Sequence, residues 1–155
     1  MKPKAVLFVC MGNICRSPAL AAVLQKLAEE KGVADQLFID SSALTTYYIG
    51  KQSDHRIRAA AEKKGVAIDH IAQLFDPVDF QKFDYVFAVN HEIKDLLLEL
   101  ASDAEKSKIF LATHFAKHFR DEEVPDPFYL GPHAFDSVME MAFDACQGIL
   151  KLLFP

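Results

Sequence analysis

The residues with the clearest capacity for chemistry lie in one short stretch, Cys-Met-Gly-Asn-Ile-Cys-Arg-Ser-Pro, at positions 10–18. An apolar run at 5–9 precedes this stretch, and a helix-like run at 19–31 follows it. A buried strand, a tight loop and a helix N-terminus in this order form an anion site, because the loop amides and the helix dipole converge on one point. Cys10 opens the loop and Arg16 closes it, so a thiol and a guanidinium would face the same anion. Such surroundings favour the thiolate, which is the nucleophilic form of cysteine.

The other loop residues complete the predicted phosphate site. Gly12 and Asn13 are residue types that tolerate the left-handed backbone of a tight loop. Two roles are open for Ser17: its hydroxyl could donate to the thiolate of Cys10, or it could cap the following helix. Pro18 fits the first helical turn. The predicted phosphate-binding set is Met11, Gly12, Asn13, Ile14, Cys15, Arg16 and Ser17.

Alternating strands and helices must position this loop. Apolar runs predict strands at 5–9, 37–39, 85–89 and 108–111, and helical spacing predicts helices at 19–31, 54–64, 91–100 and 132–153, with one or two helical turns at 76–80. Residues 69–74 fit neither pattern. The alternation predicts an α/β fold with a four-stranded, parallel, doubly wound, flavodoxin-like sheet that has helices on both faces. Ligands of such sheets bind beyond the carboxyl ends of the strands, where the sequence places Cys10, Ser41 and Asn90.

Size and composition suit one globular domain over residues 1–155, because the chain is long enough to bury a core without disulfides or metal. No apolar run approaches the length of a membrane span, and the apolar run after the N-terminus is too short for a secretory signal, which indicates a cytoplasmic protein with no membrane partner. The net charge is −5 and the cations are scattered, so no nucleic-acid surface is expected. Three cysteines do not make a disulfide framework, and Cys146 falls in the apolar stripe of the last helix.

The stretch from Val9 to Pro18 resembles the signature of the low-molecular-weight protein tyrosine phosphatases. Further matches occur in the family's order and at close to its spacing, so the resemblance spans nearly the whole chain. They are Ser41-Ser42, Gly50, Asp54-His55-Arg56, His70, Phe83-Asp84-Tyr85 and Asp126-Pro127-Phe128-Tyr129.

The resemblance implies a metal-independent and cofactor-free hydrolysis of phosphotyrosine and aryl phosphate monoesters by a monomer. Cys10 would attack phosphorus and form a cysteinyl phosphate, and Arg16 would stabilise the transition-state charge. Asp126 would protonate the leaving phenolate and later deprotonate the attacking water. The partner would be a phosphotyrosine-containing protein or an aryl phosphate.

The resemblance also assigns supporting roles. Asn13, Ser17, Ser41 and His70 would brace the loop, and Cys15 would be a redox partner of Cys10, unless it is only a small apolar residue beneath the loop. The substrate rim would comprise Met11, Ile14, Tyr47, Phe128 and Tyr129, whose apolar walls a phosphoserine would not fill. The related arginine phosphatases have a residue that looks like Thr at this loop position, so the resemblance implies that Ile14 favours phosphotyrosine.

Some positions depart from the family pattern, and two other functions are considered. Asn90 stands where Asp is frequent, Ala43-Leu44 replaces Gly-Thr, and Tyr47 stands where Trp or another aromatic residue is common. An arsenate reductase on this scaffold needs two more cysteines on a mobile segment, and residues 72–100 contain none. A phosphotyrosine-binding module without catalysis would not need both Cys10 and Asp126.

Overall fold

A computed structural model describes residues 2–155 and contains a single four-stranded sheet in which every pairing is parallel. The strand order is β2-β1-β3-β4. The strands are β1 (Lys4–Cys10), β2 (Leu37–Ala43), β3 (Tyr85–Ala88) and β4 (Ile109–Leu111). Because β2 lies on one side of β1 and β3 on the other, the direction of winding reverses at β1. The carboxyl end of β1 is therefore the topological switch point, where doubly wound sheets bind ligands.

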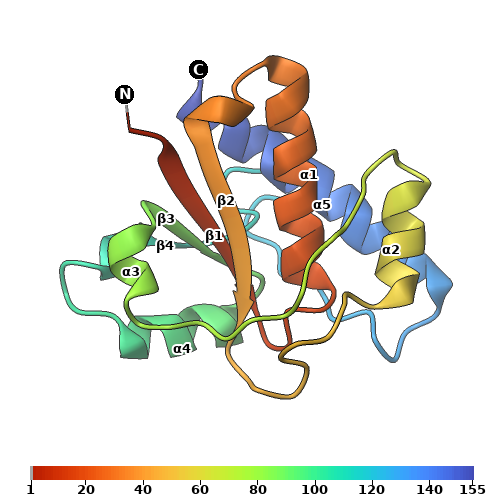
Figure 1. Ribbon diagram of the computed structural model, residues 1–155, viewed down its shortest axis with the longest axis horizontal. Coiled ribbons are helices and arrows are strands. Elements are labelled where there is room, and N and C mark those ends of the chain that lie inside the picture. Colours follow the sequence, from red (N-terminus) through yellow and green to blue (C-terminus); the bar gives the residue numbers. More distant parts are fainter. Residues whose placement is uncertain (1) are drawn as a thin grey trace.

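Helices cover both faces of the sheet, as Figure 1 shows, with α1, α2 and α5 on one side and α3 and α4 on the other. The helices are α1 (Arg16–Lys31), α2 (His55–Glu62), α3 (Asp79–Lys82), α4 (His91–Leu100) and α5 (Pro132–Leu153), and two single 3₁₀ turns span Ala34–Gln36 and Lys106–Lys108. The predicted doubly wound α/β fold is confirmed.

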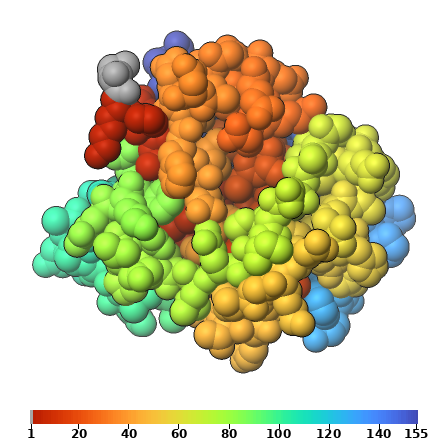
Figure 2. Space-filling model, in the orientation of Figure 1, coloured from red at the N-terminus to blue at the C-terminus, as the bar shows by residue number. Residues whose placement is uncertain are grey.

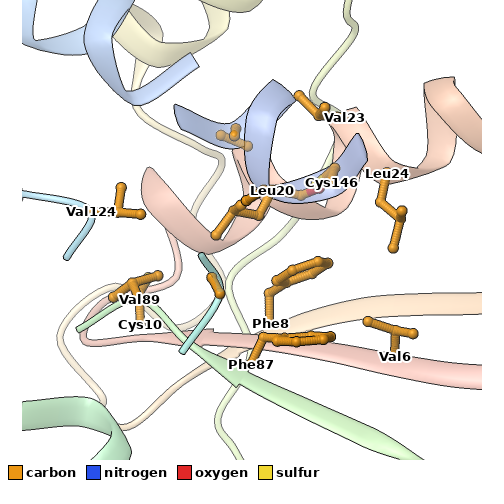
Figure 3. Close-up of a cluster of buried hydrophobic side chains, with 14 of the residues drawn as sticks. Val6, Phe8, Cys10, Leu20, Val23, Leu24, Phe87, Val89, Val124 and Cys146 are labelled. Carbon is orange, nitrogen blue, oxygen red and sulfur yellow. The ribbon is translucent and has the colours of Figure 1, made fainter. Parts of the chain in front are cut away.

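The core lies between β1 and the helices α1 and α5 (Figure 3). Phe8 stacks on Phe87 of the neighbouring strand, with ring centroids 5.5 Å apart. The Cys146 thiol donates to the Leu20 carbonyl at 3.3 Å, which satisfies a buried polar group between the two helices. The apolar stripe expected along α5 is confirmed as buried, and it consists of Phe135, Val138, Ala142, Cys146, Ile149 and Leu153.

Several boundaries differ from the sequence prediction, and the helical turns expected at 76–80 appear as α3 at Asp79–Lys82. Helix α1 begins at Arg16, three residues earlier than expected, because Pro18 costs nothing in a first turn whose N–H groups have no helical acceptors. Strand β2 extends to Ala43, since it pairs with β1 along its whole length. Residues 69–74 form no strand or helix, but Leu74 bridges to Ala43 and Ile71 bridges to Gln52. In Figure 2 the yellow-green residues 69–74 lie beside the gold segment that follows β2, near the lower centre of the visible face.

Candidate active site

The loop between β1 and α1 directs a backbone amide at the sulfur of Cys10. Asn13 has a left-handed backbone, with φ of 58°, and its N–H donates to Cys10 Sγ at 3.2 Å. The left-handed conformation expected for Gly12 is wrong, because positive φ values occur at Asn13 and not at Gly12. Gly12 is instead required by close packing: a Cβ at this position would lie 2.8 Å from the ring of Tyr48. The loop is thus tight for two separate reasons, one in the backbone and one in a neighbouring side chain.

The hydroxyl of Ser17 lies 2.9 Å from Cys10 Sγ, and the hydrogen-bond network leaves the Ser17 proton free to point at the sulfur. The Gln73 N–H, which can only donate, lies 3.0 Å from Asn13 Oδ1. The other end of the Asn13 amide must therefore be the NH₂ group, which donates to Ser17 Oγ at 2.8 Å. Since the Ser17 oxygen already accepts this bond, its own proton is available for the sulfur. This arrangement stabilises a thiolate.

Capping of α1 by Ser17, the other role considered from the sequence, is wrong. The N-cap position is Cys15, which makes no side-chain capping bond, and Ser17 lies inside the first turn.

Two further side chains hold Asn13 from the direction of β2. Asn13 Nδ2 donates to Ser41 Oγ at 3.0 Å, and His70 Nε2 donates to Asn13 Oδ1 at 2.7 Å. His70 Nε2 also lies 3.2 Å from Ser41 Oγ. The structure thus brings together the four residues predicted to brace the loop. It adds Gln73, for which the sequence carried no signal, because the bond comes from its backbone.

A stability change with pH follows from the position of His70. Burial lowers the pKa of His70, and the carboxylates of Asp40 and Asp69 only oppose this effect in part. Below the ordinary histidine pKa of about 6.5 the unfolded chain therefore binds a proton that the folded protein does not. We expect the free energy of unfolding to fall as the pH decreases below that value, by at most about 1.4 kcal/mol per pH unit for this group.

Urea unfolding between pH 5 and pH 8 measures this change. A His70→Gln variant should show a shallower decrease than the wild type, while His133→Gln, at an exposed position, should keep the wild-type slope. Equal slopes for wild type and His70→Gln would contradict the expectation.

Arg16 and Asp126 meet on the other side of the sulfur. Arg16 is only 6% exposed, and its NH1 group donates to the Val124 carbonyl at 3.2 Å. Its NH2 group lies 3.9 Å from Asp126 Oδ2, and the Asp126 side chain is 60% exposed. The segment after β4 therefore delivers both a carbonyl that orients the guanidinium and a carboxylate beside it.

A cavity of about 190 Å³ contains these groups. Phe128 and Tyr129 form one edge, with their ring centroids 4.9 Å apart, and Tyr47 forms another. Tyr48 also lines the cavity and was missed from the sequence, where its neighbour Tyr47 was chosen instead. Every residue of the predicted phosphate-binding and rim sets except the buried Ser17 lines this cavity.

The remaining two cysteines are buried thiols. Burial raises the pKa of Cys15, which is 8% exposed at the base of the loop, and burial likewise raises the pKa of Cys146 in the core. Cys15 lines the cavity and Cys146 does not. Within residues 2–155 there is no group of three or more His, Cys, Asp or Glu side chains placed to hold a metal ion.

Asn90, one of the departures from the family pattern, caps α4. Its side-chain oxygen accepts from the Ile93 N–H at 2.9 Å. Either Asn or Asp can supply this bond, so the substitution preserves the helix start.

A thiol that lies within hydrogen-bond distance of an amide and a hydroxyl, with a buried guanidinium lining the same cavity at the switch point of a parallel sheet, is an arrangement suited to an α/β enzyme that binds phosphate esters. The family model described as "Low molecular weight phosphotyrosine protein phosphatase" matches residues 5–154. The chain therefore belongs to this family, and it is a phosphatase.

Relatives and solved structures agree with this assignment. The low molecular weight phosphotyrosine protein phosphatase of Gallus gallus is 35% identical over 96% of this chain and 94% of its own. A crystal structure of a protein tyrosine phosphatase from Entamoeba histolytica is 35% identical, with a TM-score of 0.94 over 97% of this chain and 96% of its own. A Drosophila arginine phosphatase is 27% identical, with a TM-score of 0.89 over 100% of this chain and 99% of its own.

Proposed function

We propose that this protein hydrolyses phosphotyrosine and other aryl phosphate monoesters, without metal, through a cysteinyl-phosphate intermediate. The observation that carries this proposal is the convergence on Cys10 Sγ of the Asn13 N–H at 3.2 Å and the Ser17 hydroxyl at 2.9 Å. These bonds stabilise a thiolate before substrate binds, and the same groups lie where a departing thiolate would need them.

In the first step, the sulfur attacks phosphorus as the bond from phosphorus to the phenolic oxygen breaks. Arg16 and the loop amides hold the equatorial oxygens, where negative charge is concentrated. Asp126 gives its proton to the leaving oxygen, because a free phenolate is a poor leaving group.

In the second step, a water molecule attacks phosphorus and the S–P bond breaks. Asp126, now a carboxylate, takes a proton from the water, so that inorganic phosphate leaves and both side chains return to their starting forms. The Ser17 hydroxyl stabilises the sulfur as it regains its charge.

The cavity supports an aromatic substrate. Tyr47, Phe128 and Tyr129 provide apolar edges around a site whose base is the phosphate loop. The methylene of a phosphoserine would leave these edges unfilled, whereas the ring of a phosphotyrosine would contact them. Phosphoarginine is the second candidate, since an arginine phosphatase shares this fold. Ile14 on the loop favours the aryl ester.

Steady-state hydrolysis of matched phosphotyrosine, phosphoserine and phosphoarginine peptides near pH 6 tests the substrate class. We expect the phosphotyrosine peptide to have the highest kcat/KM. Turnover of phosphoarginine alone would reject the proposal, and peptide binding without turnover of any ester would indicate a binding module.

Oxidation provides a separate prediction. Peroxide should convert Cys10 to a sulfenic acid, and the Cys15 thiolate should then attack this sulfur, expel hydroxide and form a disulfide. Because burial raises the pKa of Cys15, capture should become faster as the pH increases. Dithiothreitol should restore most activity to the wild type and little to Cys15→Ser. An overoxidised Cys10 in the wild type, without a disulfide, would exclude Cys15 as its partner.

Location and assembly stay predictions. No helix in residues 2–155 is long and apolar enough to cross a membrane. We expect a cytoplasmic monomer that acts on phosphotyrosine-containing proteins, and sedimentation of the purified chain tests the monomeric state.

A further inference from the structure

The ion pair between Asp54 and Arg56 at the start of α2 is held more firmly than an ordinary surface pair. Arg56 Nε donates to Asp54 Oδ1 at 3.1 Å, and its NH2 group donates to Oδ2 at 2.9 Å. The Asp54 side chain is only 8% exposed and also caps α2 by accepting from the Arg56 N–H. Two-point pairing with a buried carboxylate restrains the guanidinium in one orientation.

This pair connects two loops that are distant in the sequence. On one side, the Asp54 N–H donates to the Ile14 carbonyl of the phosphate loop at 2.8 Å. On the other side, Arg56 NH1 donates to the Phe128 carbonyl at 3.0 Å. The guanidinium also lies between two aromatic rings, 4.9 Å from the Phe128 centroid and 4.6 Å from that of Phe135 on α5. Figure 1 shows the blue segment before α5 passing close to the start of α2.

The segment that carries Asp126 has few other attachments. Among the hydrogen bonds of residues 2–155, the bond from Arg56 to the Phe128 carbonyl alone joins 125–130 to the rest of the chain. Asp126 Oδ1 accepts from the Phe128 N–H at 3.2 Å, within its own turn, and Tyr129 is 92% exposed. The hydrogen bond at Phe128 therefore acts together with the buried Pro127 and with the 3.9 Å approach of Asp126 Oδ2 to Arg16 NH2 in setting the position of the carboxyl group.

We propose that Asp54 and Arg56 are a positioning pair for Asp126, which sets the distance between the proton donor and the phosphate held by the loop. This inference rests on the proposed function, because it concerns the acid of that reaction. Neither residue contacts the reacting atoms. Proton transfer depends steeply on geometry, and a misplacement of about 1 Å can cost on the order of 100-fold in rate.

The test compares Arg56→Lys with Arg58→Lys. Lysine keeps the charge but has no planar group for two-point pairing or for stacking between rings. Arg58 lies on the same helix, is exposed and donates only to the Ser53 carbonyl, so it is a matched control. Asp54→Asn, which can still cap α2, provides a second variant that weakens the same pair.

The measurement is kcat/KM for a series of aryl phosphates with increasingly poor leaving groups, since this constant reports the first chemical step. For phenyl phosphate, we expect Arg56→Lys and Asp54→Asn to lose roughly 10- to 100-fold. For p-nitrophenyl phosphate, which needs little help from an acid, the loss should be less than about threefold. Inhibition by inorganic phosphate should be unchanged, and Arg58→Lys should match the wild type throughout.

The outcomes separate this proposal from the proposed function. If the wild type hydrolyses no aryl phosphate, the function itself fails. If the wild type is active and Asp126→Asn shows the leaving-group dependence, but Arg56→Lys resembles Arg58→Lys, the positioning role is overturned. An equal loss for all leaving groups, together with weaker phosphate inhibition, would also overturn it, because the pair would then support the phosphate loop instead of the acid.

Discussion

Replacing Cys10 with serine is expected to lower phosphatase turnover by roughly 10⁴-fold or more, which is the scale found when a nucleophile is removed from an enzyme. A serine hydroxyl at this position has no adjacent base, because Ser17 and the Asn13 amide are donors and Asp126 serves the leaving group. The anion cradle, however, does not depend on the sulfur. Arg16 and the loop amides remain, so a phosphotyrosine peptide should bind within about tenfold of the wild-type affinity.

Single-turnover kinetics measures the loss of hydrolysis, and calorimetry measures peptide binding separately. Cys146→Ala controls for the loss of a cysteine as such, since that thiol lies in the core and outside the cavity. Trapping the wild type with acid during turnover should reveal phosphate on Cys10. Near-normal turnover by Cys10→Ser, or label on another residue, would remove Cys10 as the nucleophile.

Replacing Asp126 with asparagine should lower kcat/KM for phenyl phosphate by about 10² to 10³-fold, within the range of general acid catalysis, and should affect activated esters far less. Asparagine can still accept the Phe128 N–H bond that closes the turn at 3.2 Å, but it has no carboxyl proton to give. The variant therefore removes the proton and keeps the turn. Asp126→Ala removes both.

Comparison of these two variants separates chemistry from geometry. If Asp126→Asn and Asp126→Ala show the same loss and the same dependence on leaving group, the missing proton explains the effect. Inorganic phosphate should bind both variants at least as well as the wild type, because neither asparagine nor alanine can place a negative charge beside Arg16. A loss that is equal for good and poor leaving groups would reject Asp126 as the acid.

The fold was predictable from the sequence wherever burial is continuous. The run at 5–9 became the central strand β1, and the stripe on α5 is buried at each expected position, because apolar periodicity reports directly which face is inside. The start of α1 was less predictable. A proline at position 18 is compatible with either the first or the third residue of a helix, so it could not decide between the two.

Cys10 and Arg16 were selected from the phosphate loop and Asp126 from the family resemblance, and the structure places all three on one cavity. The site was not predictable where a contact depends on the path of the chain. Tyr48 explains the glycine at position 12, although the two are 36 positions apart. Asp54 and Arg56 were named as matches to the family pattern, but nothing local indicates that Arg56 reaches the Phe128 carbonyl.

The amide of Gln73 has a consequence for how freely this sequence can change. It fixes the orientation of Asn13 across 60 positions and thereby makes the Ser17 hydroxyl a donor to the sulfur. Because the bond to Asn13 comes from a peptide group, most side chains at position 73 preserve it, although they lose the separate bond from Gln73 Nε2 to the Ser41 carbonyl at 2.9 Å. Proline alone lacks the N–H, so a library of substitutions at this position should tolerate most amino acids and exclude proline. The hydrogen bonds around the Cys10 sulfur thus depend on the path of the backbone, which mutation of individual side chains rarely alters.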